Sequence, residues 1–171
     1  MRIIKPSNGM AMRYPRPQLM IVESYSFAGH LRVKGHMEFE TKGLSLTGMR
    51  VLVLEDDQTL RTLLSDIIRT LGGNCTTFEN ADDALIKLLE QHGGFSLTIA
   101  DHGLPGSIKG VEFLSMIQQK WPDLPCILTS GFNLDIAELN PQTVFLFKPW
   151  TLEQLLDAID RALSLKPPML S

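Results

Sequence analysis

Polar residues that could do chemistry follow four separate apolar runs of the chain. They are Glu55, Asp56 and Asp57 after the first run, Asp101 after the second, Thr129 and Ser130 at the end of the third, and Lys148 after the fourth. In a parallel sheet the carboxyl ends of the strands meet at one edge, where ligands bind, so these side chains are expected to lie together. Crowded carboxylates raise each other's pKa unless a cation holds them. The sequence therefore favours a divalent-ion site, with Lys148 supplying further positive charge.

The expected ligands also indicate which ion would bind. Magnesium suits a site of few carboxylates, a backbone carbonyl and several waters, whereas calcium prefers a fuller cage of oxygen atoms. Mg²⁺ is therefore the expected cofactor.

Strand-like and helix-like segments alternate through most of the chain. The expected strands are 51–54, 74–78, 97–101, 126–129 and 144–147, and the expected helices are 60–71, 80–89, 111–117 and 152–163. Such alternation requires right-handed crossovers and predicts a doubly wound α/β fold with five parallel strands and helices on both faces. Only twelve residues separate Gly131 from Val144, so the helix expected there is short or irregular.

The chain divides into three parts. Residues 1–48 are expected to be an N-terminal extension, 49–165 the domain and 166–171 a short tail. The extension is interpreted as a disordered tail or linker, with a piece of an upstream domain, a short hairpin or non-native leader sequence as alternatives. It carries seven Lys/Arg against three Asp/Glu, whereas residues 49–171 carry nine against sixteen. This acidic balance argues against direct nucleic-acid binding by the domain.

Four motifs in order give residues 49–165 their family resemblance. They are the acidic pair after the first strand, Asp-x-x-Leu-Pro-Gly from Asp101, Ser130-Gly131 and Lys148-Pro149. The segment resembles the receiver domain of two-component response regulators and is similar to stand-alone receivers of the chemotaxis-regulator type. The resemblance implies a flavodoxin-like sheet with the strand order 2-1-3-4-5. The short fourth helix departs from the family pattern and puts the usual output surface in doubt.

The resemblance also implies a role for each matching residue. Asp101 is the expected phosphoacceptor, Asp56 a direct Mg²⁺ ligand, Glu55 a ligand through water, Gly103 a ligand through its carbonyl, Lys148 the phosphoryl-binding cation, Ser130 the switch hydroxyl and Phe145 the aromatic switch residue. Asp57 lies one position too late for the acidic pair. Thr129 competes with Ser130, which is favoured because it directly precedes Gly131.

The implied function is that of a phosphorelay receiver with Mg²⁺-dependent self-phosphorylation and dephosphorylation, a signalling phosphoacceptor rather than an enzyme. Its expected partners are a sensor histidine kinase or histidine phosphotransfer protein and an unknown downstream protein. A cytoplasmic location is expected, since no apolar run is long enough to span a membrane and the two cysteines have no metal-ligand spacing.

The sequence is also compatible with two alternative functions. One is a receiver-like interaction module that works without phosphate. The other is a phosphatase of the haloacid dehalogenase type, suggested by Glu55-x-Asp57-x-Thr59. That family needs a nucleophilic Asp at the first of these positions, where this chain has Glu55.

Overall fold

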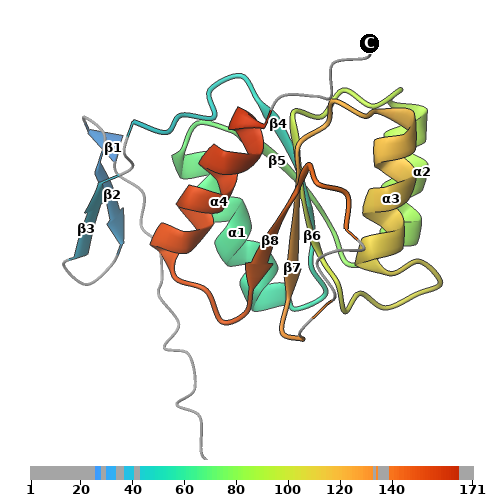
Figure 1. Ribbon diagram of the computed structural model, residues 1–171. Helices are drawn as coiled ribbons and strands as arrows, with labels where there is room; N and C mark the ends of the chain where they lie inside the picture. The colour runs from blue at the N-terminus through green and yellow to red at the C-terminus, as the bar shows by residue number, and fades with distance from the viewer. Residues whose placement is uncertain are drawn as a thin grey trace, which may run out of the picture.

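The computed structural model describes residues 43–132, 134 and 139–165, together with three short strands that precede them. These strands are β1 (Ser26–Phe27), β2 (His30–Val33) and β3 (Met37–Glu40). They pair antiparallel in the order β1-β2-β3 and form a sheet separate from the main one (Figure 1). Other expectations for residues 1–42, and those for the tail 166–171, fall outside the described residues.

The main sheet has five parallel strands in the order β5-β4-β6-β7-β8. Its elements are β4 (Arg50–Leu54), α1 (Gln58–Thr70), β5 (Asn74–Phe78), α2 (Ala81–Glu90), β6 (Leu97–Asp101), α3 (Gly110–Lys120), β7 (Cys126–Ser130), β8 (Thr143–Phe147) and α4 (Leu152–Ser164). Counted from β4, this is the strand order 2-1-3-4-5, so the predicted fold is confirmed. The helix expected between Gly131 and Val144 falls largely on residues outside the described ones.

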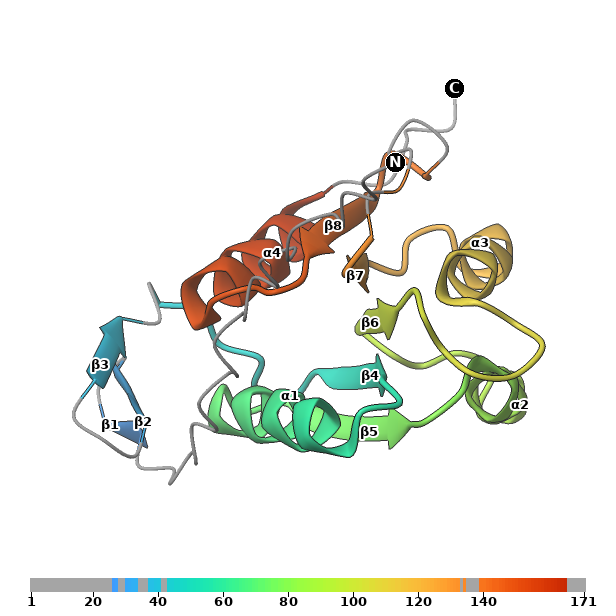
Figure 2. The same cartoon turned by 90° about the horizontal axis from the view of Figure 1, so that it is seen from below.

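Alternating side chains of β4, an inner strand of the sheet, contribute to two hydrophobic cores. Val51 and Val53 face α1 and α4, whereas Leu52 and Leu54 face α2 and α3. Figures 1 and 2 show these helix pairs on opposite sides of the sheet. Because side chains of a strand point alternately to its two faces, a strand between two helical layers must be apolar throughout. The continuous apolar run after Arg50 therefore correctly predicted a strand buried on both faces.

Capping residues start the first two helices just beyond their strands. Asp57 accepts a hydrogen bond from the N–H of Leu60 at 2.8 Å, and Asn80 accepts one from the N–H of Asp83 at 2.8 Å. Such caps satisfy N–H groups that have no partner inside the helix. Asp57 thus starts α1 and holds its carboxylate at the helix end.

Among the described residues, no helix combines the length and apolar character needed to cross a bilayer.

Core packing begins before Met49. Leu46 is fully buried in the core on the α1 side, and its N–H donates to the carbonyl of Leu71 at 2.8 Å. A Cβ atom added at Gly73 would lie only 3.1 Å from the Leu46 Cβ, so the turn after α1 closes tightly over this leucine. The packed domain therefore includes residues on the N-terminal side of the expected boundary.

Replacing Leu46 with alanine should lower the free energy of unfolding by about 2–5 kcal/mol, because a fully buried leucine leaves a cavity when it is truncated. Urea unfolding followed by circular dichroism measures the change. The exposed neighbour provides a control, since Ser45→Ala should change stability by no more than about 0.5 kcal/mol. Equal stability of the two variants would show that Leu46 does not belong to the folded core.

Candidate functional site

Asp101 ends β6, the middle strand of the sheet, and its carboxylate is held at both oxygen atoms. The Oδ2 atom accepts a hydrogen bond from the N–H of Gly103 at 2.8 Å. The Oδ1 atom lies 2.7 Å from the Nζ atom of Lys148, which reaches in from the end of β8. The Asp101 side chain is only 9% exposed. A strand buried on both faces therefore presents one oriented carboxylate at the sheet edge.

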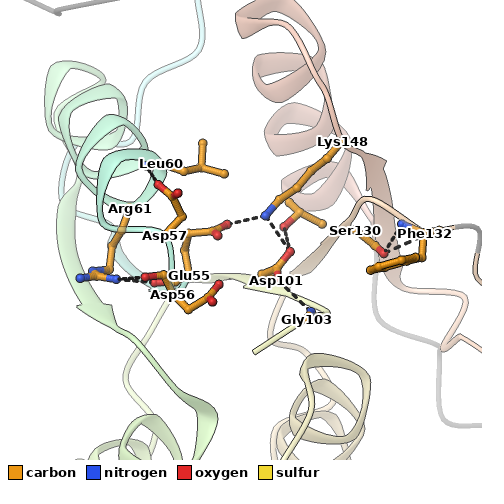
Figure 3. A network of polar contacts seen from close by, with 11 residues as sticks. Glu55, Asp56, Asp57, Leu60, Arg61, Asp101, Gly103, Ser130, Phe132 and Lys148 are labelled. Atoms are coloured by element: carbon orange, nitrogen blue, oxygen red, sulfur yellow. Dashed lines mark hydrogen bonds and ion pairs between the residues drawn. The ribbon is translucent and has the colours of Figure 1, made fainter. Parts of the chain in front are cut away.

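Lys148 joins two carboxylates that come from different strands. Its Nζ atom lies 2.7 Å from Oε2 of Glu55 as well as 2.7 Å from Oδ1 of Asp101. Figure 3 shows the lysine extending between them. These bonds draw together the carboxyl ends of β4, β6 and β8, as the sequence predicted for a parallel sheet.

Burial and ion pairing act in opposite directions on these groups. Burial raises the pKa of Glu55 above the usual glutamate value, and the hydrogen bond from Lys148 offsets only part of that effect. For Lys148, burial alone would lower the pKa, but the hydrogen bonds to Asp101 and Glu55 and the negative charges of these two carboxylates together outweigh it and leave the pKa raised. The lysine is therefore firmly cationic at neutral pH, whereas burial disfavours the charged form of Glu55.

Three carboxylates at this edge could hold a divalent ion. Ligand oxygens of Glu55, Asp56 and Asp101 all lie within 4.8 Å of one another. Carboxylate oxygens are the ligands that Mg²⁺ prefers, and it retains waters when few protein ligands are available. This set of donors fits the predicted ion. Asp57 is turned away to cap α1, which agrees with its exclusion from the acidic pair.

The two hydroxyl residues at the end of β7 have different partners. Thr129 is paired with Asp101 in the sheet register, and its Oγ1 donates to Oδ1 of Asp101 at 3.4 Å. The Oγ of Ser130 instead accepts from the N–H of Phe132 at 3.0 Å and donates to the Phe132 carbonyl at 3.2 Å. In this conformation Thr129, rather than the favoured Ser130, therefore contacts the phosphoacceptor candidate.

Phe145 is half-buried on β8 and packs against the core on the α2 and α3 side. Its ring centroid lies 6.5 Å from that of Phe147 in a tilted arrangement. Phe147 is 45% exposed, and Phe132, beside Ser130, is 71% exposed. The predicted aromatic position therefore lies next to exposed aromatic surface rather than deep in the core.

Two residues that position the site were not singled out from the sequence. Arg61 of α1 donates to the backbone carbonyls of Glu55 and Asp56, at 2.6 and 3.1 Å. Gly110 starts α3 so close to β6 that an added Cβ atom would lie 2.1 Å from the Asp101 carbonyl. Only the position of Arg61, one turn beyond the helix cap, could have drawn attention to it. The close contact at Gly110 depends on tertiary packing and has no local signal.

A doubly wound parallel sheet that gathers carboxylates, a lysine and hydroxyl groups at the carboxyl ends of its strands has the architecture of a signal receiver. The sequence profile of the response regulator receiver domain matches residues 51–160, and the chain belongs to this family. Members are signalling phosphoacceptors that interact with histidine kinases and generally bind Mg²⁺ at an acidic pocket.

Individual known proteins agree with this assignment. The response regulator protein FleR of Pseudomonas aeruginosa is 34% identical over 116 residues, which cover 66% of this chain and 24% of FleR. The hydrogenase transcriptional regulatory protein HoxA of Cupriavidus necator is 32% identical over 121 residues, covering 66% of this chain and 23% of HoxA. The chain thus spans about a quarter of the length of these curated relatives.

A solved structure shows the same fold. The response regulator receiver protein from Sinorhizobium medicae superposes with a TM-score of 0.63 and 22% sequence identity, covering 70% of this chain and 97% of that protein. Similarity at this level of identity shows the fold alone.

Replacing Glu55 with glutamine should stabilise the metal-free protein at pH 7. Because its pKa is raised on folding, ionised Glu55 carries a cost in the folded state that the unfolded chain does not. At about pH 3, more than one unit below the ordinary glutamate pKa, the residue is largely protonated in both states, so the advantage of the variant should vanish there. Urea midpoints measured in EDTA at both pH values test this.

Asp57→Asn is the matched control, since it removes an exposed carboxylate and keeps a side chain able to cap α1. Its stability should follow that of the wild type at both pH values. A lower urea midpoint for Glu55→Gln than for the wild type at pH 7 would contradict the expected cost of the buried charge.

Proposed function

We propose that this receiver accepts a phosphoryl group on Asp101 and switches a protein-interaction surface in response. The observation that supports this best is the placement of Asp101, whose Oδ1 lies 2.7 Å from a cationic lysine while two further carboxylates stand beside it. Phosphoryl transfer depends mainly on positioning and on neutralising charge, which this arrangement supplies.

The transfer itself needs one nucleophile and a phosphorylated donor. A carboxylate oxygen of Asp101 attacks phosphorus and forms an acyl phosphate. The bond from phosphorus to the donor atom breaks, and its electron pair leaves with the donor, which is the imidazole of a phosphohistidine or the acetate of acetyl phosphate. No oxidant or further reactant is required.

The neighbouring residues prepare Asp101 for this step. The N–H of Gly103 fixes Oδ2, so the carboxylate is held in one orientation. Lys148 can shift from the carboxylates to an oxygen of the incoming group, because its long side chain already reaches the centre of the site. When bound by Asp56, Asp101, the Gly103 carbonyl and, through water, Glu55, Mg²⁺ would supply neutralisation of the charge that develops on the phosphoryl oxygens.

Ser130 is the proposed switch residue. Its hydroxyl is bonded to the backbone of Phe132, so turning it towards a phosphoryl oxygen on Asp101 would break two hydrogen bonds and release that loop. A phosphoryl group brings strong acceptor oxygens and up to about two negative charges, which can compensate for the broken bonds. Phe145, on the adjoining strand, would then change its packing and alter the exposed aromatic surface.

The proposed donor is a sensor histidine kinase or a histidine phosphotransfer protein, in keeping with the family. The downstream target is a protein that recognises the surface near Phe132 and Phe147. Because Lys148, Asp101 and the acidic pair are all present, phosphate-dependent signalling is preferred to an interaction module that works without phosphate.

Beryllofluoride, a mimic of the phosphoryl group, should bind in the presence of Mg²⁺ and shift amide NMR signals around Asp101, Ser130 and Lys148. Asp101→Asn should abolish the response, because an amide oxygen cannot form the required bond to beryllium. Asp57→Asn, which alters a neighbouring carboxylate outside the proposed ligand set, should respond like the wild type. Absence of shifts in the wild type, with the protein folded, would favour the phosphate-independent module.

Substitution of the two hydroxyl residues should separate their roles. Ser130→Ala should still bind beryllofluoride but lose most of the accompanying shift at Phe145, since the group that couples Asp101 to the loop is gone. Thr129→Val should keep that shift, because the Thr129 hydroxyl bonds to Asp101 itself, whereas the loop at Phe132 is bonded by Ser130. The opposite pattern, read from the same NMR titration, would transfer the switch to Thr129.

A further inference from the structure

The Arg61 side chain contacts the backbone of the acidic pair, Glu55 and Asp56, and also the Glu79 carboxylate. Its Nη1 atom donates to the backbone carbonyls of Glu55 and Asp56, at 2.6 and 3.1 Å. Its Nη2 atom lies 2.7 Å from Oε1 of Glu79, in the loop that follows β5. The arginine side chain is only 13% exposed. Figure 3 shows the guanidinium beside the turn that carries both acidic residues.

These contacts fix the backbone of the acidic pair. A guanidinium is planar and presents its N–H groups in a rigid fork, so two carbonyls bound to one nitrogen are held in a set relation to each other. The carboxylates of Glu55 and Asp56 extend from the same two residues. Both carbonyls face Arg61, so their backbone orientation, and with it the direction of each side chain, is restricted before any ion arrives.

Charge alone would make Arg61 a poor neighbour for a divalent cation. Glu79 offsets this positive charge, because its carboxylate pairs with Nη2 of Arg61, the nitrogen that does not bind the two carbonyls. Glu79 is itself largely exposed, at 70%, so its carboxylate stays in contact with solvent. The fork can thus hold the carbonyls while much of its positive charge is balanced away from the acidic pair.

From this geometry we infer that Arg61 is a positioning residue for the divalent ion, holding Glu55 and Asp56 in the arrangement that binds it. The inference rests on the proposed magnesium site and assigns a role to a residue outside its ligand set. Partners of this kind, one step removed from the ion, typically change metal affinity by about 10- to 100-fold when they are replaced. The fork geometry, rather than the positive charge, is the property that matters.

Binding of Mn²⁺, a paramagnetic substitute for Mg²⁺, can be measured on the full chain by the loss of the free-ion electron paramagnetic resonance signal, without any phosphoryl donor. Arg61→Met keeps an extended side chain but removes every donor, and it should raise the Kd about 10- to 100-fold. Arg61→Lys keeps the charge without the planar fork and should also bind more weakly than the wild type.

Two control variants separate positioning from general loosening. Glu79→Gln keeps both carbonyl contacts and should change the Kd by less than about fivefold, as expected for loss of an ion pair whose carboxylate is largely exposed. Ile68→Val destabilises the buried face of α1 without changing any contact of the acidic pair, and it should leave the Kd for Mn²⁺ unchanged. Circular dichroism of each metal-free variant verifies folding, and Arg61→Lys carries the test if Arg61→Met does not fold.

Several results would overturn the inference. Wild-type affinity in Arg61→Met would show that the carbonyl contacts do not matter, and tighter binding would show that the arginine opposes the ion. Wild-type affinity in Arg61→Lys would assign the effect to charge. A wild-type protein that binds no Mn²⁺ would instead overturn the magnesium site itself, so failure of the proposed function can be told apart from failure of the role of Arg61.

Discussion

The position of Lys148 between Glu55 and Asp101 is the interaction on which the site depends. The Lys148 ammonium group lies 2.7 Å from each of two buried carboxylates and so screens their repulsion. Without the lysine, the two carboxylates would repel each other in a site with little solvent. The lysine is separated from Glu55 by 93 residues and arrives from β8, an edge strand. The charge balance at the centre of the sheet is therefore complete only when the last strand has paired.

The three consecutive acidic residues after β4 show how orientation divides chemically similar groups. Glu55 points to Lys148, Asp57 caps α1, and Asp56 remains exposed beside Asp101. Two contacts from the start of helix α1 maintain this division. The N–H of Leu60 binds the Asp57 carboxylate, and the Arg61 side chain binds the backbone carbonyls of the acidic pair. A short stretch of chain thus holds one ion-paired, one available and one structural carboxylate.

Much of this architecture could be predicted from the sequence because it follows from local patterns. The continuous apolar run of β4 indicated a strand buried on both faces, and alternation with helices indicated a parallel sheet whose strand ends would bring Asp101 and Lys148 together. Contacts that depend on tertiary geometry could not be predicted in the same way.

In the sequence, Arg61 resembles any other arginine of a helix, and only the structure shows that its guanidinium binds two backbone carbonyls. The hydroxyl partners of Thr129 and Ser130 depend on which way each side chain faces at the end of β7, and Leu46 extends the core beyond the first recognisable strand.

Mapping the phosphorylated residue would test the proposal that Asp101 accepts the phosphoryl group. After incubation with acetyl phosphate and Mg²⁺, borohydride reduction converts an aspartyl phosphate to homoserine, which mass spectrometry of the digested protein can locate. We expect homoserine at position 101 and nowhere else among the acidic residues of the site. Modification at Asp56 or Asp57, or a phosphoryl group found instead on Ser130, would contradict the proposal.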